Sequence, residues 1–365
     1  MPEFVHLHNH SDYSLLDGAV SISKLVAQAK AFGMKHLALT DHGNMFGSLK
    51  FYKECKANGI NPLIGSEFYV APGSRFVKSG TEKGNKYFHL ILLAKNVAGY
   101  RNLMELTSKA YLEGFYYKPR IDEELLKNHA EGLIALSACL AGTIPQAIIA
   151  GNDEEALKKA QWYDELFGRG NFYLELQDHG IPEQKIVNKG LTGIAKKTGI
   201  PLVATNDIHY LKKEHANAQD ILICIGTNKK KSETSRLTFG ADQFYFKSAE
   251  EMAALFFEHP DAIENSLRIA ESCALEIPQP GPLLPDYEIP REFSTPEAYM
   301  RHIVEEGLKQ VYPEVTEEIR RRAEYELRVI QEMGFTGYFL IVWDFISFAR
   351  KRGIPVGPGR GSGAG

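Results

Sequence analysis

The chain has 365 residues, of which 44% are hydrophobic and 24% charged, and such values are typical of soluble globular proteins. The formal net charge of −4 argues against a uniformly basic coat for nucleic acid but leaves room for a local basic groove. No run approaches the roughly 20 apolar residues of a membrane span, and the N-terminus lacks the zones of a signal peptide. We therefore expect a cytoplasmic protein with no membrane partner, in which the widely spaced Cys55, Cys139, Cys224 and Cys273 are free thiols.

Up to about residue 210, short apolar or β-branched runs alternate with helical patterns, as in β-α units around a parallel sheet. In residues 21–32, for example, Ile22, Leu25 and Ala29 fall on one helical face before the stop at Gly33. Strands are predicted over residues 4–7, 35–40, 63–70, 87–94, 132–137, 171–176 and 201–205. An open doubly wound sheet usually begins with a Gly-rich turn, whereas the first turn here is HLHNHSDYS. The sequence therefore predicts an α/β fold, a closed or nearly closed (β/α)7 barrel.

The pattern becomes mainly helical from residue 220 to about 273, and six prolines then crowd into residues 278–296. Because a regular element cannot absorb so many prolines, we expect a domain at 1–277, a boundary at 278–296 and a second domain at 297–365. The second domain has helical patterns over residues 296–312, 314–333 and 337–352, followed by GIPVGPGRGSGAG.

Potential metal ligands recur beside the predicted strand ends. These are His6, His8 and His10 after the first strand, Asp41 and His42 after the second, and Asp207 and His209 after the seventh. In α/β barrels the C-terminal ends of the strands converge on one site, so residues far apart in sequence can meet there. Four more residues are placed to join that site, which forms the mouth of the predicted barrel, namely Asp17, Glu67, His89 and Cys139.

Imidazoles, bridging carboxylates and a thiolate suit zinc, manganese or iron, and such a set is too rich in nitrogen for calcium or magnesium alone. With four to six ligands for each ion, the site would hold two or three metals, which activate water and hold the oxygens of a phosphate ester. Each motif alone has an ordinary explanation, since an HxH is often polar surface and Cys139 alone is more often a core thiol. Their joint placement at strand ends favours metal-dependent phosphoester hydrolysis.

A basic segment with aromatic residues lies near the predicted mouth and comprises Arg75, Phe76, Lys78, Lys83, Lys86 and Tyr87. Such a composition is typical of a surface that grips a nucleic-acid strand, and equally of a solvated loop. We interpret Lys229–Lys231 as ordinary surface, and His36 and His179 as structural.

The motifs HLHNHSDYSLLDG, LTDHGNMFG, IGSEFYV, FHLILLA and ATNDIHY, in this order, resemble those of the PHP phosphoesterase family. With KPRID, the Pro-rich boundary, GFTGYFLIVWDF and VGPGRGSGAG, the whole chain resembles the N-terminal part of the bacterial replicative DNA polymerase III alpha subunits. The resemblance implies a distorted barrel and excludes His6 as a ligand. It implies nine metal ligands: His8, His10, Asp17, His42, Glu67, His89, Cys139, Asp207 and His209.

The same resemblance implies that the C-terminal segment opens a polymerase palm, in which Arg360, Gly361 and Ser362 contact the phosphates of an incoming nucleotide. The palm aspartates that hold catalytic magnesium lie further along in that family, so we do not expect this chain to polymerise DNA by itself. The implied partners are DNA and, in a full-length polymerase, other replisome subunits including the sliding clamp.

Three functions follow as hypotheses. The first is a metal-dependent 3′–5′ proofreading exonuclease, favoured because none of the ligand positions is lost. The second is a non-catalytic module that binds metals to stabilise the polymerase. The third is hydrolysis of a small phosphomonoester, which the polymerase-like C-terminal segment disfavours.

Overall fold

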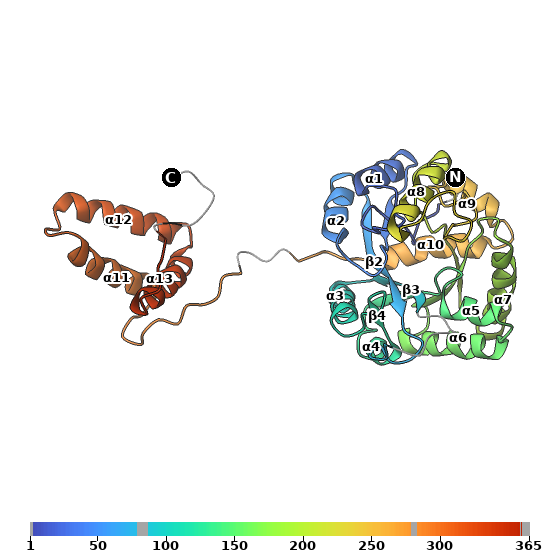
Figure 1. The fold of residues 1–365 in the computed structure, drawn as a ribbon, viewed down its shortest axis with the longest axis horizontal. Helices are drawn as coiled ribbons and strands as arrows, with labels where there is room; N and C mark the ends of the chain where they lie inside the picture. The colour runs from blue at the N-terminus through green and yellow to red at the C-terminus, as the bar shows by residue number, and fades with distance from the viewer. Residues whose placement is uncertain (1–2, 79–86, 279–282, 358, 360–365) are drawn as a thin grey trace. The chain divides into compact units, whose positions relative to one another are not determined.

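The computed structural model describes residues 3–78, 87–278, 283–357 and 359, and the chain divides into two compact units, Met1–Pro278 and Gln279–Gly365 (Figure 1). In the described residues, no single helix is long and apolar enough to cross a membrane. The bent pair Glu317–Glu332 and Thr336–Lys351 satisfies length and composition only when its two helices, 115° apart, are taken together.

The first unit is built on one curled sheet of seven strands, in the order β1-β2-β3-β5-β6-β7, with β4 paired to β2. The strands are β1 (His36–Leu39), β2 (Asn61–Val70), β3 (Phe88–Ala94), β4 (Arg120–Ile121), β5 (Leu133–Leu136), β6 (Phe172–Leu176) and β7 (Leu202–Ala204). The α/β barrel expected from the sequence is confirmed. Six of the seven predicted strands are present, and β4, only two residues long, is too short to stand out as an apolar run.

The expectation of a parallel sheet is wrong at β3, which runs antiparallel to both of its neighbours, β2 and β5. The other pairings are parallel. Since β3 runs the opposite way, its first residues, Phe88 and His89, lie at the edge of the sheet where the parallel strands end. The reversal brings His89 to the predicted mouth, which a parallel strand would have placed at the far end.

The predicted first strand, residues 4–7, is not a regular strand, although its chain is extended between the two edges of the sheet. The carbonyl of His6 accepts from Ala38 N at 3.1 Å, and Ile208 N donates to the carbonyl of His8 at 3.1 Å. Side chains replace much of a regular ladder, because Asn9 Nδ2 donates to the carbonyls of His6 and Ala38. The segment therefore links β1 to the chain after β7 and holds its histidines at the barrel mouth.

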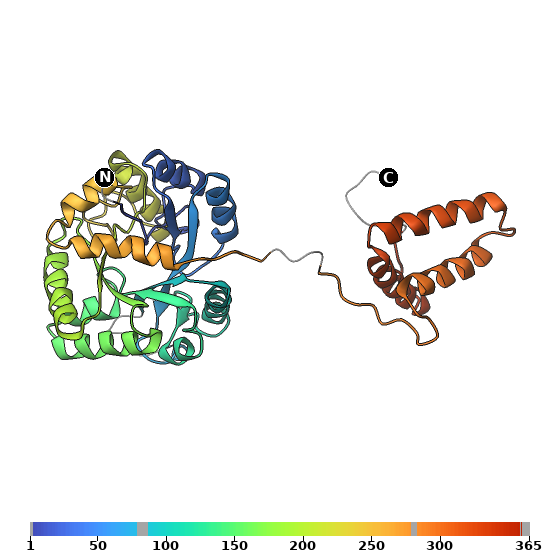
Figure 2. The ribbon, with the colours of Figure 1, turned by 180° about the vertical axis from the view of Figure 1, so that it is seen from behind.

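Helices surround the sheet (Figures 1 and 2). In the first unit they are α1 (Ile22–Ala31), α2 (Ser48–Ala57), α3 (Val97–Leu112), α4 (Glu123–Asn128), α5 (Thr143–Ile149), α6 (Asp153–Phe167), α7 (Pro182–Thr198), α8 (Ala216–Thr227), α9 (Ala249–Leu255) and α10 (Pro260–Ser272). One apolar cluster, which includes Phe51 and Leu191, lies between sheet and helices. A second, with Leu7 and Ile91, includes Ile269 of α10, and Figure 2 shows this helix running across the sheet. Apolar packing on two sides holds the strand ends in place.

The second unit contains α11 (Pro296–Val311), α12 (Glu317–Glu332) and α13 (Thr336–Lys351), which confirms the three predicted helices. Thr295 and Thr316 cap the first two, and their hydroxyls accept from Ala298 N and Ile319 N. The predicted phosphate contacts at residues 360–362 lie outside the described residues.

Candidate metal centre

A cavity of about 550 Å³ opens at the edge of the sheet where the parallel strands end. Among the residues that line it are seven of the nine predicted ligands: Asp17, His42, Glu67, His89, Cys139, Asp207 and His209. The other two, His8 and His10, are fully buried and contact residues of this lining. The structure thus brings together side chains that span two hundred positions of the sequence.

Glu67 lies at the centre of this group, and its two carboxylate oxygens face four histidines. Oε1 lies 2.7 Å from His89 Nδ1 and 3.6 Å from His8 Nε2. Oε2 lies 2.6 Å from His42 Nδ1 and 3.4 Å from His10 Nε2. The side chain is only 1% exposed, so its charge is compensated within the protein rather than by water. A carboxylate placed in this way can bridge two metal ions.

Three donor atoms beside Glu67 form a nearly equilateral triangle. His8 Nε2 and His10 Nε2 are 3.1 Å apart, and each lies 3.2 Å from Asp207 Oδ1. Ligands bound about 2.0–2.1 Å from a tetrahedral zinc ion are separated by roughly 3.3 Å, so this triangle has the dimensions of one tetrahedral face. The spacing of the three donor atoms thus fits a metal ion.

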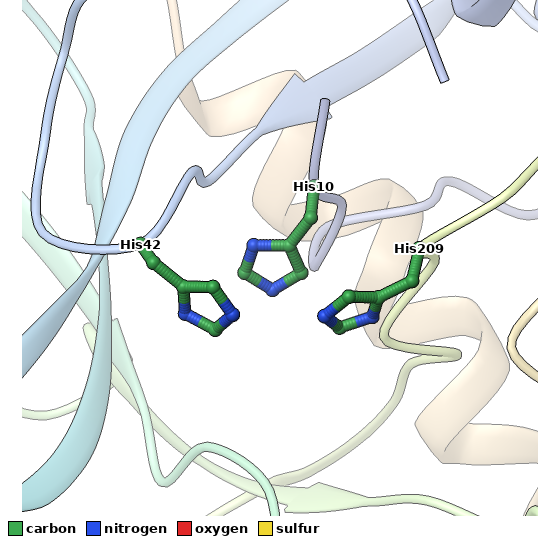
Figure 3. A group of neighbouring side chains, drawn as sticks. All are labelled: His10, His42 and His209. Atoms are coloured by element: carbon green, nitrogen blue, oxygen red, sulfur yellow. The ribbon is translucent and has the colours of Figure 1, made fainter. Parts of the chain in front are cut away.

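His10, His42 and His209 form a second group, whose rings come from three separate segments and turn toward one another in Figure 3. The ring centroids of His10 and His42 are 4.0 Å apart, and those of His10 and His209 are 4.3 Å apart. His209 donates through Nδ1 to the carbonyl of Asp207 at 2.9 Å, which leaves its Nε2 buried without a hydrogen-bond partner. That nitrogen is free to bind a cation.

His42, Glu67 and His89 form the third group, which Asp17 and Cys139 adjoin. Asp17 Oδ2 lies 3.3 Å from His42 Nε2, and Cys139 Sγ lies 3.6 Å from His89 Nδ1. The residue before Cys139, Ala138, has φ 63°, and Asp207 has φ 47°, so the backbone is in the left-handed region next to one predicted ligand and at another. Non-glycine residues adopt that region at a cost, and such sites cluster where function fixes a side chain.

The buried charges strongly perturb one another. Burial disfavours charge on His8, but the surrounding carboxylates, Asp207 foremost, raise its pKa well above the usual value. Burial and the neighbouring charges of His42 and His209 instead lower the pKa of His10 well below it. Two histidines whose nitrogens are 3.1 Å apart are thus driven in opposite directions. A divalent cation relieves this conflict, since it binds both imidazoles in their neutral form.

The carboxylates and the thiol show the same coupling. Burial opposes ionisation of Asp17, but the charge of His42 outweighs it and lowers the pKa of Asp17 to about 2. Burial raises the pKa of the Cys139 thiol well above its usual value, and the charge of Glu67 adds to the effect. The thiol is therefore protonated when no cation is bound, and a metal would have to displace its proton.

Several buried polar atoms at the site have no hydrogen-bond partner. They are Asp17 Oδ1, His42 Nδ1, Glu67 Oε2, Asp207 Oδ1 and His209 Nε2. At 2.6 Å, His42 Nδ1 and Glu67 Oε2 are in contact without the angles of a hydrogen bond. Orphaned buried polar atoms are costly, and their concentration on one cavity fits a site that binds metal ions through these atoms.

The model of the family described as PHP domain matches residues 6–179 of the chain. That range contains His8, His10, Asp17, His42, Glu67, His89 and Cys139. The chain carries a PHP domain. The expected resemblance to this family is therefore confirmed, and residues 6–179 are referred to below as the PHP domain.

A second family model, described as Bacterial DNA polymerase III alpha NTPase domain, matches residues 298–365. The DNA polymerase III subunit alpha of Treponema pallidum is 58% identical over 361 residues, which cover 99% of this chain and 31% of that protein. The corresponding protein of Borreliella burgdorferi is 55% identical over 363 residues, or 99% of this chain and 32% of that protein. The chain thus spans about a third of the length of these relatives, and nearly all of its own residues align with them.

Among solved structures, a two-domain protein of Bacteroides vulgatus, described as containing a predicted PHP-like metal-dependent phosphoesterase, matches with a TM-score of 0.34 and 12% identity. The match covers 57% of this chain and 52% of that protein.

Two further carboxylates support the histidines of the PHP domain, and sequence reasoning did not assign either role. Glu175 Oε1 accepts from His8 Nδ1 at 2.7 Å. Asp41 accepts from the hydroxyl of Ser14, which lies 3.1 Å from His10 Nδ1. Both contacts occupy Nδ1 and turn Nε2 toward the triangle, as the hydrogen-bond acceptors beside metal-bound histidines do. Glu175 lies inside an apolar strand, FYLEL, and a charge at such a position is the signal that could have revealed it.

We expect Glu175→Gln to weaken zinc binding by about 10- to 100-fold, the usual effect of losing a carboxylate that orients a ligating histidine. The amide keeps the shape of the side chain but removes the charge that holds the proton on His8 Nδ1. Competition with a zinc chelator measures the change. Glu155→Gln, on the exposed surface of α6, is the matched control, and equal zinc affinity in all three proteins would exclude the proposed role.

Of the other interpretations made from the sequence, the one for His6 agrees with the structure and the one for Arg75 does not. His6 is buried and its Nε2 contacts the carbonyl of Lys247 at 2.8 Å, away from the triangle. Arg75, which we considered for DNA binding, is instead 7% exposed and pairs with Asp122 at 2.9 Å and Glu113 at 2.7 Å. These ion pairs neutralise the charge of Arg75, so the residue is not available to bind DNA. Lys83 and Lys86 lie outside the described residues.

Proposed function

We propose that the first unit, Met1–Pro278, which contains the PHP domain, is a metal-dependent phosphodiesterase that removes nucleotides from the 3′ end of DNA for a replicative polymerase. The triangle of His8, His10 and Asp207 carries the proposal, because its edges of 3.1–3.2 Å fit a metal ion at the buried end of the cavity. The similarity of the chain to DNA polymerase III alpha subunits supports DNA as the substrate.

The proposed ligands are the nine residues predicted from the sequence, with zinc, manganese or iron as the ions. Two or three such ions would supply Lewis-acid activation of the phosphate and a water nucleophile near neutral pH. Glu67 would be shared between ions, because each of its oxygens faces two histidines. Glu175 keeps the proton of His8 on Nδ1, and Ser14 holds His10 in the same way, so both Nε2 atoms remain available.

The cavity gives the site access to a polymer end. Asp17, His42 and His89 lie at its wall, whereas His8 and His10 are fully buried. A phosphate that enters the cavity would therefore meet the outer residues first. In the full-length context we propose DNA and other replisome subunits, including the sliding clamp, as partners in the cytoplasm, and a magnesium-dependent polymerase site outside these 365 residues.

An exonuclease assay on the purified protein tests this function. We expect release of nucleotides from a 3′-labelled primer with manganese or zinc, and no release above the metal-free background by His8→Ala. The variant removes one corner of the triangle and leaves Asp207 with one imidazole fewer. His36→Ala, at the opposite end of β1, should retain the activity. Robust release by His8→Ala would refute the assignment of the activity to this site.

Two other functions make different predictions. A non-catalytic metal module would bind metal and turn over no phosphoester. A small-molecule phosphatase would hydrolyse para-nitrophenyl phosphate and leave the primer intact. The same purified protein decides among the three functions when metal content, primer and small ester are measured together.

A further inference from the structure

Beyond the predicted ligands, the cavity has walls of two kinds. Next to His42 and His89 lie two aromatic rings and one cation, namely Tyr69, Tyr87 and Lys118. Next to His209 the wall is apolar. It is made by Leu16, Ile181, Ile223, Leu237, Phe239 and Phe244. The predicted ligands would hold the metal ions, and the ions would hold a phosphate without contacts to either wall. The two walls therefore indicate which further groups of a substrate the cavity accommodates.

Lys118 is the one lysine or arginine among the described residues that line the cavity. Its Nζ lies 5.2 Å from the ring centroid of Tyr69, and that ring contacts both His42 and His89, with centroids 6.1 and 5.3 Å away. Within the described residues no carboxylate lies within 4.0 Å of the ammonium group, although the charge of Asp17 acts on it. The cation is therefore held beside the metal ligands without being neutralised.

The backbone around Lys118 is also specialised. Tyr117, the preceding residue, has φ 62°, one of four non-glycine residues with positive φ in the described chain. Of the others, Ala138 precedes the predicted ligand Cys139, and Asp207 is itself a predicted ligand; both ligands line the same cavity. Partial burial lowers the pKa of Lys118, as expected for an ammonium group that has lost water. Such a group gains most when a phosphate oxygen replaces that water.

The apolar wall is in contact with the metal centre. Phe239 meets His209 edge-on at 4.7 Å between centroids and lies 4.7 Å from Phe244. Leu237 is 57% exposed and Leu16 is 39% exposed, so this wall presents apolar surface to the solvent. Inorganic phosphate or a sugar phosphate could not cover that surface. A nucleobase has the flat apolar face that can, and a cavity of about 550 Å³ has the volume of a small-ligand site.

We propose that the cavity holds one unpaired terminal nucleotide, with its base against Phe239 and Leu237 and its phosphate between the metal ligands and Lys118. The inference deepens the proposed function and rests on it. A paired base is stacked in a duplex, so reaching this wall requires a single-stranded or opened end. Lys118 is then a substrate-binding residue of the site, and the apolar wall separates nucleotides from other phosphates.

Calorimetric titration of the full chain, loaded with zinc, tests this binding mode. The probes are thymidine 5′-monophosphate, its base-free analogue 1,2-dideoxyribose 5-phosphate, and inorganic phosphate. We expect the nucleotide to bind about tenfold more tightly than the base-free analogue, the usual scale of one base stacked on an aromatic ring. This comparison uses only the wild-type protein.

Variants separate the two walls. Lys118→Gln should weaken nucleotide and base-free analogue alike by about tenfold, the scale of one charge-assisted hydrogen bond, and Lys118→Arg should retain most of the affinity. Phe239→Ala should weaken the nucleotide alone. The matched controls are Lys24→Gln and Phe257→Ala, both exposed and remote from the cavity lining. Zinc content measured on each protein shows that the metal ligands are intact.

The outcomes are distinct. Equal affinity of the three probes for the wild type overturns the nucleotide mode, and an unchanged affinity of Lys118→Gln overturns the role of Lys118. Neither result depends on turnover. A wild type that discriminates among the probes but releases nothing from a primer supports this pocket while the proposed exonuclease fails.

Discussion

Glu67→Gln is expected to lower phosphodiester hydrolysis by about 100- to 5,000-fold and to reduce the metal content of the protein. The carboxylate contacts four histidines, at 2.6–3.6 Å, and is 1% exposed. Removing one partner from a buried charge network costs about 3–5 kcal/mol, and each 1.36 kcal/mol corresponds to a factor of ten. The amide retains the volume of the side chain, so the loss would report the charge and not the packing.

Metal analysis by plasma mass spectrometry, together with the primer assay, measures both effects. Glu131→Gln, on the exposed surface before β5, should leave metal content and rate unchanged. A Glu67→Gln protein with full metal content and wild-type rate would contradict a bridging role. Loss of metal without any activity in the wild type would instead favour the non-catalytic module.

Strand-end positions are the reason that the sequence predicts so much of the site. His42 and Asp207 each lie three residues after the end of a strand, β1 at Leu39 and β7 at Ala204, and parallel strands bring such positions to one edge. His89 is different, since it opens its strand. It reaches the site because β3 is antiparallel, and an apolar run carries no information on its direction. The residue pattern named His89 only as able to join the mouth, and the resemblance to known motifs made it a ligand.

The partners of residues that act through another side chain were beyond the sequence. Glu175 stands out as a charge in an apolar strand, but its role depends on the 2.7 Å contact with a histidine 167 positions away. Lys118 follows a left-handed Tyr117, and no periodicity indicates such a conformation. Arg75 shows the opposite error. This basic residue was considered for DNA binding, but in the folded protein it forms an ion pair with Asp122. Charge in a sequence does not reveal whether it is neutralised in the fold.

Removal of metal is expected to lower the melting temperature of the first unit by on the order of 10 °C. A ligand present at a thousandfold excess over its dissociation constant stabilises the folded state by about 4 kcal/mol for each site. In a domain of this size, about 1 kcal/mol corresponds to roughly 2–4 °C. The physical cause is the buried, unpartnered oxygen atoms of Asp17, Glu67 and Asp207, which a chelated protein leaves without a cation.

Calorimetric scans with and without chelator measure the shift, and two features make them specific. Among the described residues, the groups able to hold a metal all lie in Met1–Pro278, so a separate transition of the helical unit should not move. Glu67→Gln should show a smaller shift than the wild type, because part of its metal is already lost. Identical wild-type scans would mean that the cavity binds no ion tightly. Both the catalytic and the structural hypothesis predict a large shift in melting temperature, so such a shift establishes only that the cavity binds metal. Hydrolysis that is lost in His8→Ala is what would assign catalysis to the bound metal.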